Sequence, residues 1–145
     1  MNVIAMYQAQ IQRILLTTAL SFGLAVAGYS LAHAEVRQET NDQQISYQTG
    51  GVGQEELAEL RQNASNYNTQ FSFANAADKA YLNNLQIRIV NDQDALVFED
   101  NAVGPMLYLQ LEPGTYELSA TSNEVEKKLK FTVKKDAKVE EVITW

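Results

Sequence analysis

Apolar and polar side chains alternate in short runs along the second half of the chain, from residue 69 onward. Such alternation is typical of β-strands that bury one face and expose the other to water. In LQIRIV, residues 85–90, the polar residues Gln86 and Arg88 separate aliphatic ones. Seven strands are predicted in this way, at residues 70–74, 85–90, 95–99, 106–111, 115–120, 128–134 and 138–145. Short strands at this regular spacing favour a mostly antiparallel β-sandwich, so the predicted fold class is mainly β.

The same alternation predicts which side chains form the core. The residues expected to point inward are Phe71, Phe73, Leu85, Ile87, Ile89, Leu107, Leu109, Leu111, Tyr116, Leu118, Ala120, Leu129, Phe131, Val133, Ile143 and Trp145. About sixteen large side chains are enough for the core of a domain of this size.

One short helix, at about residues 54–67, is predicted ahead of the strands. Leu57, Leu60, Ala64 and Tyr67 recur at helical spacing, and two glutamates occupy its first turn, where the helix dipole favours negative charge. Because this apolar stripe is narrow, we expect the helix to lie on the sheet. The preceding GGVG, residues 50–53, is expected to be a loop that enters the helix. A phosphate-binding loop would need a preceding strand and a Lys-Ser or Lys-Thr pair.

The first 34 residues have the pattern of an export signal. Arg13 is their only charged side chain, an apolar stretch covers residues 14–31, and Ala32 and Ala34 supply the small residues of a cleavage site before Glu35. A membrane anchor is the alternative, since roughly 18–20 apolar residues span a bilayer. The small-residue ending favours cleavage, so we expect a periplasmic or secreted protein. The chain has no cysteine, which excludes a lipoprotein anchored through one.

Two segments are predicted in the mature chain. Residues 35–49 are polar and without a period, and they are interpreted as a flexible lead, whereas residues 50–145 form the domain with its N-terminal helix. The whole sequence has 11 Lys and Arg residues, of which Arg13 lies in the export segment. The mature chain, residues 35–145, therefore has ten Lys and Arg residues and 18 Asp and Glu residues, which gives a formal charge of −8. This balance argues against nucleic acid as the main partner.

The mature chain lacks the side chains that most often perform catalysis. Its sequence contains no cysteine, and the only histidine, His33, lies in the export segment. The usual proton shuttle, the thiol nucleophile and the usual zinc ligands are therefore missing. No catalytic, cofactor-binding or metal-binding residue is predicted. Asp92, Asp94, Glu99 and Asp100 could gather near one end of the sandwich as calcium ligands, but solvated turns explain them as well.

A Pro-Gly turn interrupts the alternation between Leu111 and Tyr116. Pro113 presets φ for a turn and Gly114 is expected at positive φ, so that the flanking strands fold back as a hairpin. Tyr116 then occupies a tyrosine-corner position, where its ring packs and its hydroxyl binds nearby backbone.

GPMLYLQLEPGTYELSAT, residues 104–121, resembles the prealbumin-like β-sandwich of carboxypeptidase regulatory-like domains. IRIVNDQDALVFED, residues 87–100, resembles the preceding hairpin of these domains, which usually have a glycine where Gln93 or Asp94 stands. The order of GGVGQEE, YNTQFSFA, AYL, GP and Trp145 is similar to that in small exported proteobacterial proteins with such a domain. The resemblance covers Gly50–Trp145. It implies a seven-stranded prealbumin-like or Ig-like fold and an accessory, non-catalytic role.

Six of the seven lysines lie on one predicted hairpin: Lys127, Lys128, Lys130, Lys134, Lys135 and Lys138. Lys128, Lys130 and Lys134 are expected to share its outward face. Lysines protect the edge strand of a sheet from pairing with another chain, which is the simpler interpretation. The alternative is a docking face for an acidic partner or an anionic envelope polymer.

Three functions remain open at this point. The favoured one is a periplasmic module that binds an envelope protein or polymer, with loops or an edge strand as the contact surface. A structural or chaperone-like accessory of envelope assembly is the second, and a carboxylate-dependent hydrolase is a remote third.

Overall fold

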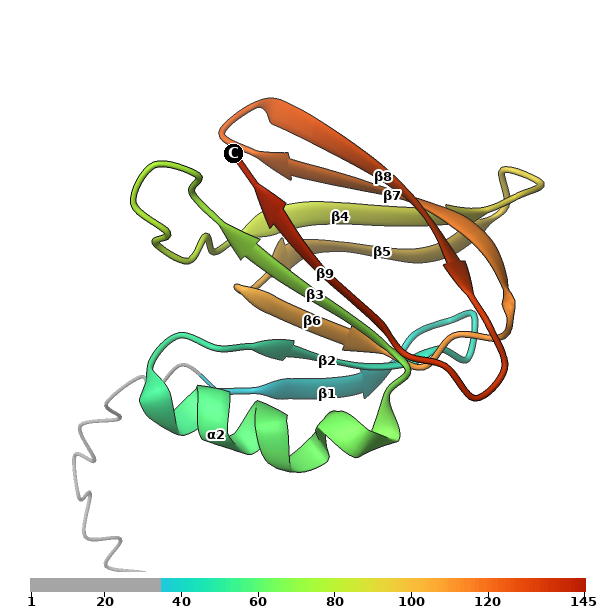
Figure 1. Ribbon diagram of the computed structural model, residues 1–145, viewed down its shortest axis with the longest axis horizontal. Helices are drawn as coiled ribbons and strands as arrows, with labels where there is room; N and C mark the ends of the chain where they lie inside the picture. Colours follow the sequence, from blue (N-terminus) through green and yellow to red (C-terminus); the bar gives the residue numbers. More distant parts are fainter. Residues whose placement is uncertain (1–34) are drawn as a thin grey trace, which may run out of the picture. The chain divides into compact units, whose positions relative to one another are not determined.

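The computed structural model describes residues 35–145, so the predicted export segment and its cleavage site lie outside the described residues. The described part is mainly β, with one short helix (Figure 1). Its elements are β1 (Arg37–Thr40), β2 (Ser46–Gly50), α2 (Gln54–Asn63), the 3₁₀ turn η1 (Ala64–Asn66), β3 (Thr69–Ala74), β4 (Leu85–Asn91), β5 (Leu96–Val103), β6 (Met106–Leu109), β7 (Gly114–Ser122), β8 (Val125–Val133) and β9 (Val139–Thr144). Within residues 35–145, no helix has the length and apolar character that crossing a membrane requires.

The strands form two sheets. One sheet has the order β1-β2-β6-β3-β9 and the other the order β5-β4-β7-β8. Neighbouring strands are antiparallel except β3 and β9, which are parallel. Aromatic pairs connect the sheets: the ring centroids of Phe71 and Phe131 are 5.2 Å apart, and those of Tyr47 and Phe98 are 4.8 Å apart. The buried side chains of both sheets thus form one hydrophobic core.

The seven predicted strands are all present, as β3 to β9, and the alternation predicted their buried faces well. Of the sixteen expected core residues, all are buried except Leu129 and Trp145, which are half-buried and pack against the core.

The helix covers the other face of the five-stranded sheet, as the stripe of Leu57, Leu60, Ala64 and Tyr67 predicted. These residues pack in a second cluster with Val36 of the N-terminal segment and Met106 and Tyr108 of β6. Tyr108 is therefore only 8% exposed, although it points away from the main core.

The prediction of a flexible lead at residues 35–49 was wrong, because this segment forms β1 and β2 and raises the strand count to nine. Strand β2 lies inside the sheet, between β1 and β6. Two of its polar side chains are buried and donate hydrogen bonds: the Gln48 amide nitrogen to the Leu60 carbonyl at 3.0 Å, and the Thr49 hydroxyl to the Met106 carbonyl at 2.8 Å. The Gln48 Oε1 is buried without a partner among residues 35–145. Residues 35–49 were expected to be flexible because they are polar, but hydrogen bonds to residues far along the chain stabilise them as strands.

The predicted Pro-Gly hairpin is also absent. Strand β6 belongs to the five-stranded sheet and β7 to the four-stranded sheet, so residues 110–113 cross from one sheet to the other. Gly114 does not adopt positive φ. The tyrosine corner itself is confirmed: the Tyr116 hydroxyl donates to the Glu112 carbonyl at 2.7 Å, and the ring stacks on Phe131 with centroids 5.5 Å apart. Tyr116 thereby fixes the crossing.

We expect Tyr116→Phe to lower the free energy of unfolding by about 1 kcal/mol, the typical value of one hydrogen bond. The ring stays in place, while the Glu112 carbonyl loses its partner. Urea denaturation measures the change. Tyr81→Phe is the matched control, because Tyr81 is 51% exposed, and it should leave stability unchanged. Equal stability of the two variants would mean that the corner does not fix the crossing.

Candidate functional site

The four carboxylates considered as calcium ligands are not brought together. Asp92 and Asp94 lie in the turn between β4 and β5, while Glu99 and Asp100 lie farther along β5. Asp100 accepts a hydrogen bond from Arg37 at 2.8 Å. Among residues 35–145, no three or more Asp, Glu or His side chains form a group that could hold a metal ion.

The β4–β5 turn is explained by its backbone. The Asn91 side-chain oxygen accepts from the backbone N–H groups of Gln93 and Ala95, at 3.0 and 2.9 Å. Asp94 has φ 58°, the left-handed conformation that glycine adopts most readily.

Polar contacts connect the edge strands β1 and β5. The Arg37 guanidinium donates to the Asp100 carboxylate and, at 2.9 Å, to the Ala102 carbonyl. The neighbouring Tyr47 hydroxyl donates to Glu39 at 2.7 Å. Burial, and secondly the Glu39 carboxylate, raise the pKa of Tyr47 far above its ordinary value. This tyrosine therefore stays neutral and acts as a structural donor.

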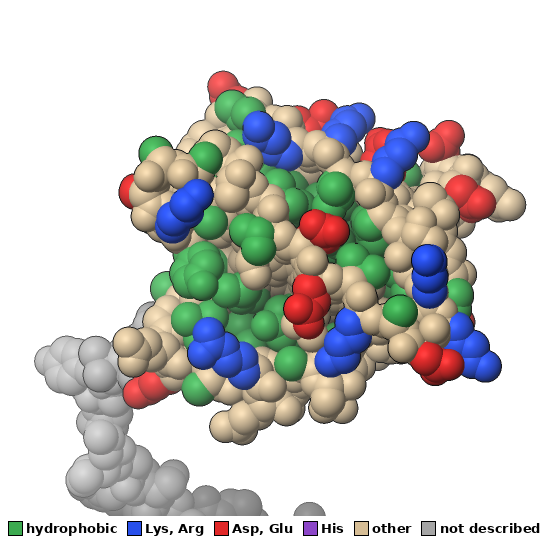
Figure 2. Space-filling model, in the orientation of Figure 1, with side chains coloured by type: hydrophobic (Ala, Val, Ile, Leu, Met, Phe, Trp, Pro, Cys, Tyr) green, Lys and Arg blue, Asp and Glu red, His purple; other side chains and the backbone are tan. Residues whose placement is uncertain are grey.

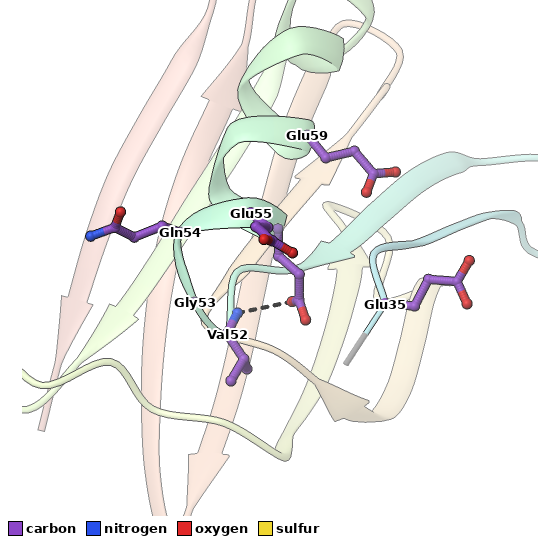
Figure 3. A pocket seen from close by; sticks show the side chains of 7 residues that line it. Glu35, Val52, Gly53, Gln54, Glu55 and Glu59 are labelled. Atoms are coloured by element: carbon purple, nitrogen blue, oxygen red, sulfur yellow. Dashed lines mark hydrogen bonds between the residues drawn. The ribbon is translucent and has the colours of Figure 1, made fainter. Parts of the chain in front are cut away.

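The GGVG segment is a loop that enters α2, as predicted, although β2 does precede it. The Glu56 carboxylate accepts from the backbone N–H groups of Gly51 and Val52, at 2.8 and 2.9 Å. Figure 3 shows the second of these bonds, from Val52. Gly51 has φ 102°, which strongly favours glycine. The donors that could have bound a phosphate are thus occupied by a side chain of the protein. Glu35, Glu55 and Glu59 line the adjacent hollow and add further negative charge.

We expect Glu56→Ala to destabilise the protein by about 2 kcal/mol, because two hydrogen bonds to a carboxylate are lost and the buried Gly51 N–H loses its partner. Thermal unfolding measures the loss. Glu55→Ala removes the same charge from an exposed position of the same helical turn and should change stability by less than about 0.5 kcal/mol. A Glu56 variant as stable as the Glu55 variant would contradict this role.

The structure divides the lysine cluster into two groups. Figure 2 shows that Lys and Arg side chains are spread over the visible face of the molecule, with Asp and Glu side chains among them. Lys127, Lys128 and Lys130 lie on β8, which is an edge strand because it pairs only with β7. Lys128 and Lys130 each lie 3.9 Å from the Glu117 carboxylate on β7. Strand β8 ends at Val133, so Lys134 does not share their face as predicted; it begins the turn to β9.

Strand β8 is an edge of the four-stranded sheet and β9 an edge of the five-stranded sheet. Each has a charged residue on the face of the strand that points toward the core. Lys127 is in register with the buried Ala120, and Glu141 of β9 is in register with the buried Phe71. An inward charge on an edge strand opposes the addition of another strand, because pairing would bury the charge. The β8 lysines therefore agree with the edge-protection interpretation.

The second group, Lys134, Lys135 and Lys138, lines a cavity of about 440 Å³. Three segments meet there: η1 with the link that follows it, the crossing between β6 and β7, and the β8–β9 turn. None of the three lysines forms an ion pair with a carboxylate of residues 35–145. Glu112 and Asp136 line the same cavity, so its five charged side chains, three lysines and two carboxylates, sum to one positive charge in a domain of net negative charge.

Asn68 forms hydrogen bonds to the other two segments that line this cavity. Its side-chain amide donates to the Leu111 carbonyl at 2.7 Å and accepts from the Leu111 N–H at 3.0 Å. Its own carbonyl accepts from the Val139 N–H at 2.8 Å, directly after the lysine turn. One residue thus connects the three segments, so the cavity is formed before any ligand binds. Sequence analysis missed Asn68, because a single asparagine between a tyrosine and a threonine gives no signal.

Comparison of the chain with family models, with curated proteins and with solved structures gave no match. The site is therefore interpreted from its own geometry.

Proposed function

We propose that residues 35–145 form an exported, non-catalytic β-sandwich of the prealbumin-like or Ig-like type that binds an anionic envelope protein or polymer. The observation that carries the proposal is the convergence of Lys134, Lys135 and Lys138, without ion-pair partners in the described chain, on a preformed cavity. The resemblance to carboxypeptidase regulatory-like domains agrees with an accessory binding role. Two sheets with a shared core support the sandwich.

The other two functions receive less support. A chaperone-like accessory that captures client strands would need an accommodating sheet edge, and β8 and β9 have inward charges at Lys127 and Glu141. A carboxylate-dependent hydrolase would need an acid and a base in one cleft. The carboxylates Asp92, Asp94, Glu99 and Asp100 do not form such a group. Glu112 and Asp136 do share one cavity, but they share it with three lysines, which favours binding of an anion.

Charge neutralisation tests the proposal. We expect the triple variant Lys134→Gln, Lys135→Gln, Lys138→Gln to bind soluble polyanions about tenfold more weakly, because three exposed charge contacts of roughly 0.5 kcal/mol each are lost. The probes are oligogalacturonate and oligoglutamate, measured by titration calorimetry at low and at high salt. Binding by the unaltered protein should weaken as salt rises.

The matched control is Lys127→Gln, Lys128→Gln, Lys130→Gln, which removes the same total charge from the edge strand β8. It should retain most of the affinity. If both triple variants lose affinity equally, the effect comes from net charge. If the unaltered protein binds neither these two probes nor oligoalginate, the proposed function is wrong.

A further inference from the structure

The cavity offers hydrogen-bond acceptors as well as positive charge. Glu112 comes from the β6–β7 crossing and Asp136 from the lysine turn, and both line the cavity together with the three lysines. Gln110 and Ser65 add an amide and a hydroxyl. Within residues 35–145, none of these four side chains forms a hydrogen bond. A ligand that satisfies this set must supply negative charge together with several donors.

We infer that the ligand is a sugar-acid unit of an acidic polysaccharide; this inference rests on the proposed function and specifies its ligand. A uronic-acid ring has one carboxylate for the lysines and several hydroxyl groups, each of which donates and accepts. The hydroxyls donate to Glu112 and Asp136 and accept from Gln110 and Ser65. The volume of about 440 Å³ is within the usual range of roughly 300–1,000 Å³ for small-molecule sites.

Other anionic ligands fit this chemistry less well. A phosphate-rich chain has dense negative charge and few donors, so Glu112 and Asp136 would repel it. A lipid surface would need apolar side chains to insert, and the large apolar residues that are exposed in residues 35–145 lie elsewhere: Val52, Tyr81, Leu96, Val125 and Val142.

An acidic peptide is the closest competitor. Extended peptides commonly bind by adding a strand to a sheet edge. The edges next to the cavity are β8 and β9, whose inward Lys127 and Glu141 oppose such an addition. A sugar ring occupies a hollow without pairing with a strand, so the geometry favours the polysaccharide.

The sign of one mutational effect separates the two ligands. Glu112→Ala removes a negative charge next to the lysines, so it strengthens the binding of any ligand held by charge alone. For a sugar acid, the same change removes a hydroxyl acceptor, and we expect oligogalacturonate and oligoalginate to bind three- to tenfold more weakly. Glu99→Ala is the charge-matched control on the distant β5 strand and should leave both affinities unchanged.

The probes are oligogalacturonate, its methyl ester, oligoalginate and oligoglutamate, each titrated calorimetrically into the unaltered protein and both variants. We expect the acid oligosaccharides to bind, the neutral ester to bind at least tenfold more weakly, and oligoglutamate to bind more weakly than either acid sugar. Tighter binding of oligoglutamate, or stronger sugar binding by Glu112→Ala, overturns the sugar-acid inference and leaves the anion-binding function in place. Absence of binding to all four probes overturns both.

Discussion

Replacing Leu109 with alanine should lower the free energy of unfolding by about 2–5 kcal/mol, the range for a large aliphatic side chain removed from a packed core. Leu109 is completely buried on β6, in register with Tyr47 of β2 and Thr69 of β3, so neighbouring strands limit how far the cavity can collapse. Chemical denaturation measures the loss. Val142→Ala on β9, where the side chain is 67% exposed, should cost less than about 0.5 kcal/mol. A Leu109 effect as small as that of Val142 would place β6 outside the core.

Tyr108→Ala should cost about 3 kcal/mol, although Tyr108 lies on the opposite face of the same strand. The alternation alone would have placed this ring in water. The helix covers it, and Tyr108 packs with Leu60 and with Tyr67, whose ring centroid is 6.4 Å away. Burial raises the pKa of Tyr108 above its ordinary value, as expected for a ring enclosed between helix and sheet.

Hydrogen exchange distinguishes this loss from a general weakening of the core. In Tyr108→Ala, the amides of α2 should exchange faster while those of β4 and β7 remain protected, because the helix loses its contact before the two sheets separate. Tyr108→Phe keeps the ring and should behave as the unaltered protein does. Uniform loss of protection across helix and sheets would show that the helix does not form a separate layer.

Most of the strands that could be predicted from sequence have two faces that differ in polarity. Leu85, Ile87 and Ile89 alternate with Gln86 and Arg88 because one face of β4 packs against the core and the other meets water. This information is local, so a single sequence contains it. The helix was predictable for the same reason, since its one apolar stripe repeats at helical spacing.

Strands β1 and β2 could not be predicted, because their stability comes from residues far along the chain. Gln48 and Thr49 are buried and polar, and their partners are Leu60 and Met106. No local pattern indicates that a polar side chain will find such a partner. The crossing after β6 was missed for a related reason: Pro113 and Gly114 signal a change of direction, but whether the next strand pairs or changes sheet depends on the whole topology.

The candidate site was predictable only in part. The sequence shows that six of the seven lysines lie within residues 127–138, and the predicted strands placed them on one hairpin. Their division into edge-strand lysines and cavity lysines depends on where β8 ends, at Val133, and on Asn68 and Glu112, which approach the turn from other parts of the chain.

The central claim is that the cavity of Lys134, Lys135 and Lys138 is the binding site for an anionic ligand. Backbone amide chemical shifts, recorded while oligogalacturonate is added, test it most directly because they locate the contact. The account predicts the largest shifts in the three segments around the cavity, residues 65–68, 110–113 and 134–138, with small shifts at residues 127–130. Shifts concentrated at 127–130, or no saturable shifts with this or any other polyanion, would contradict it.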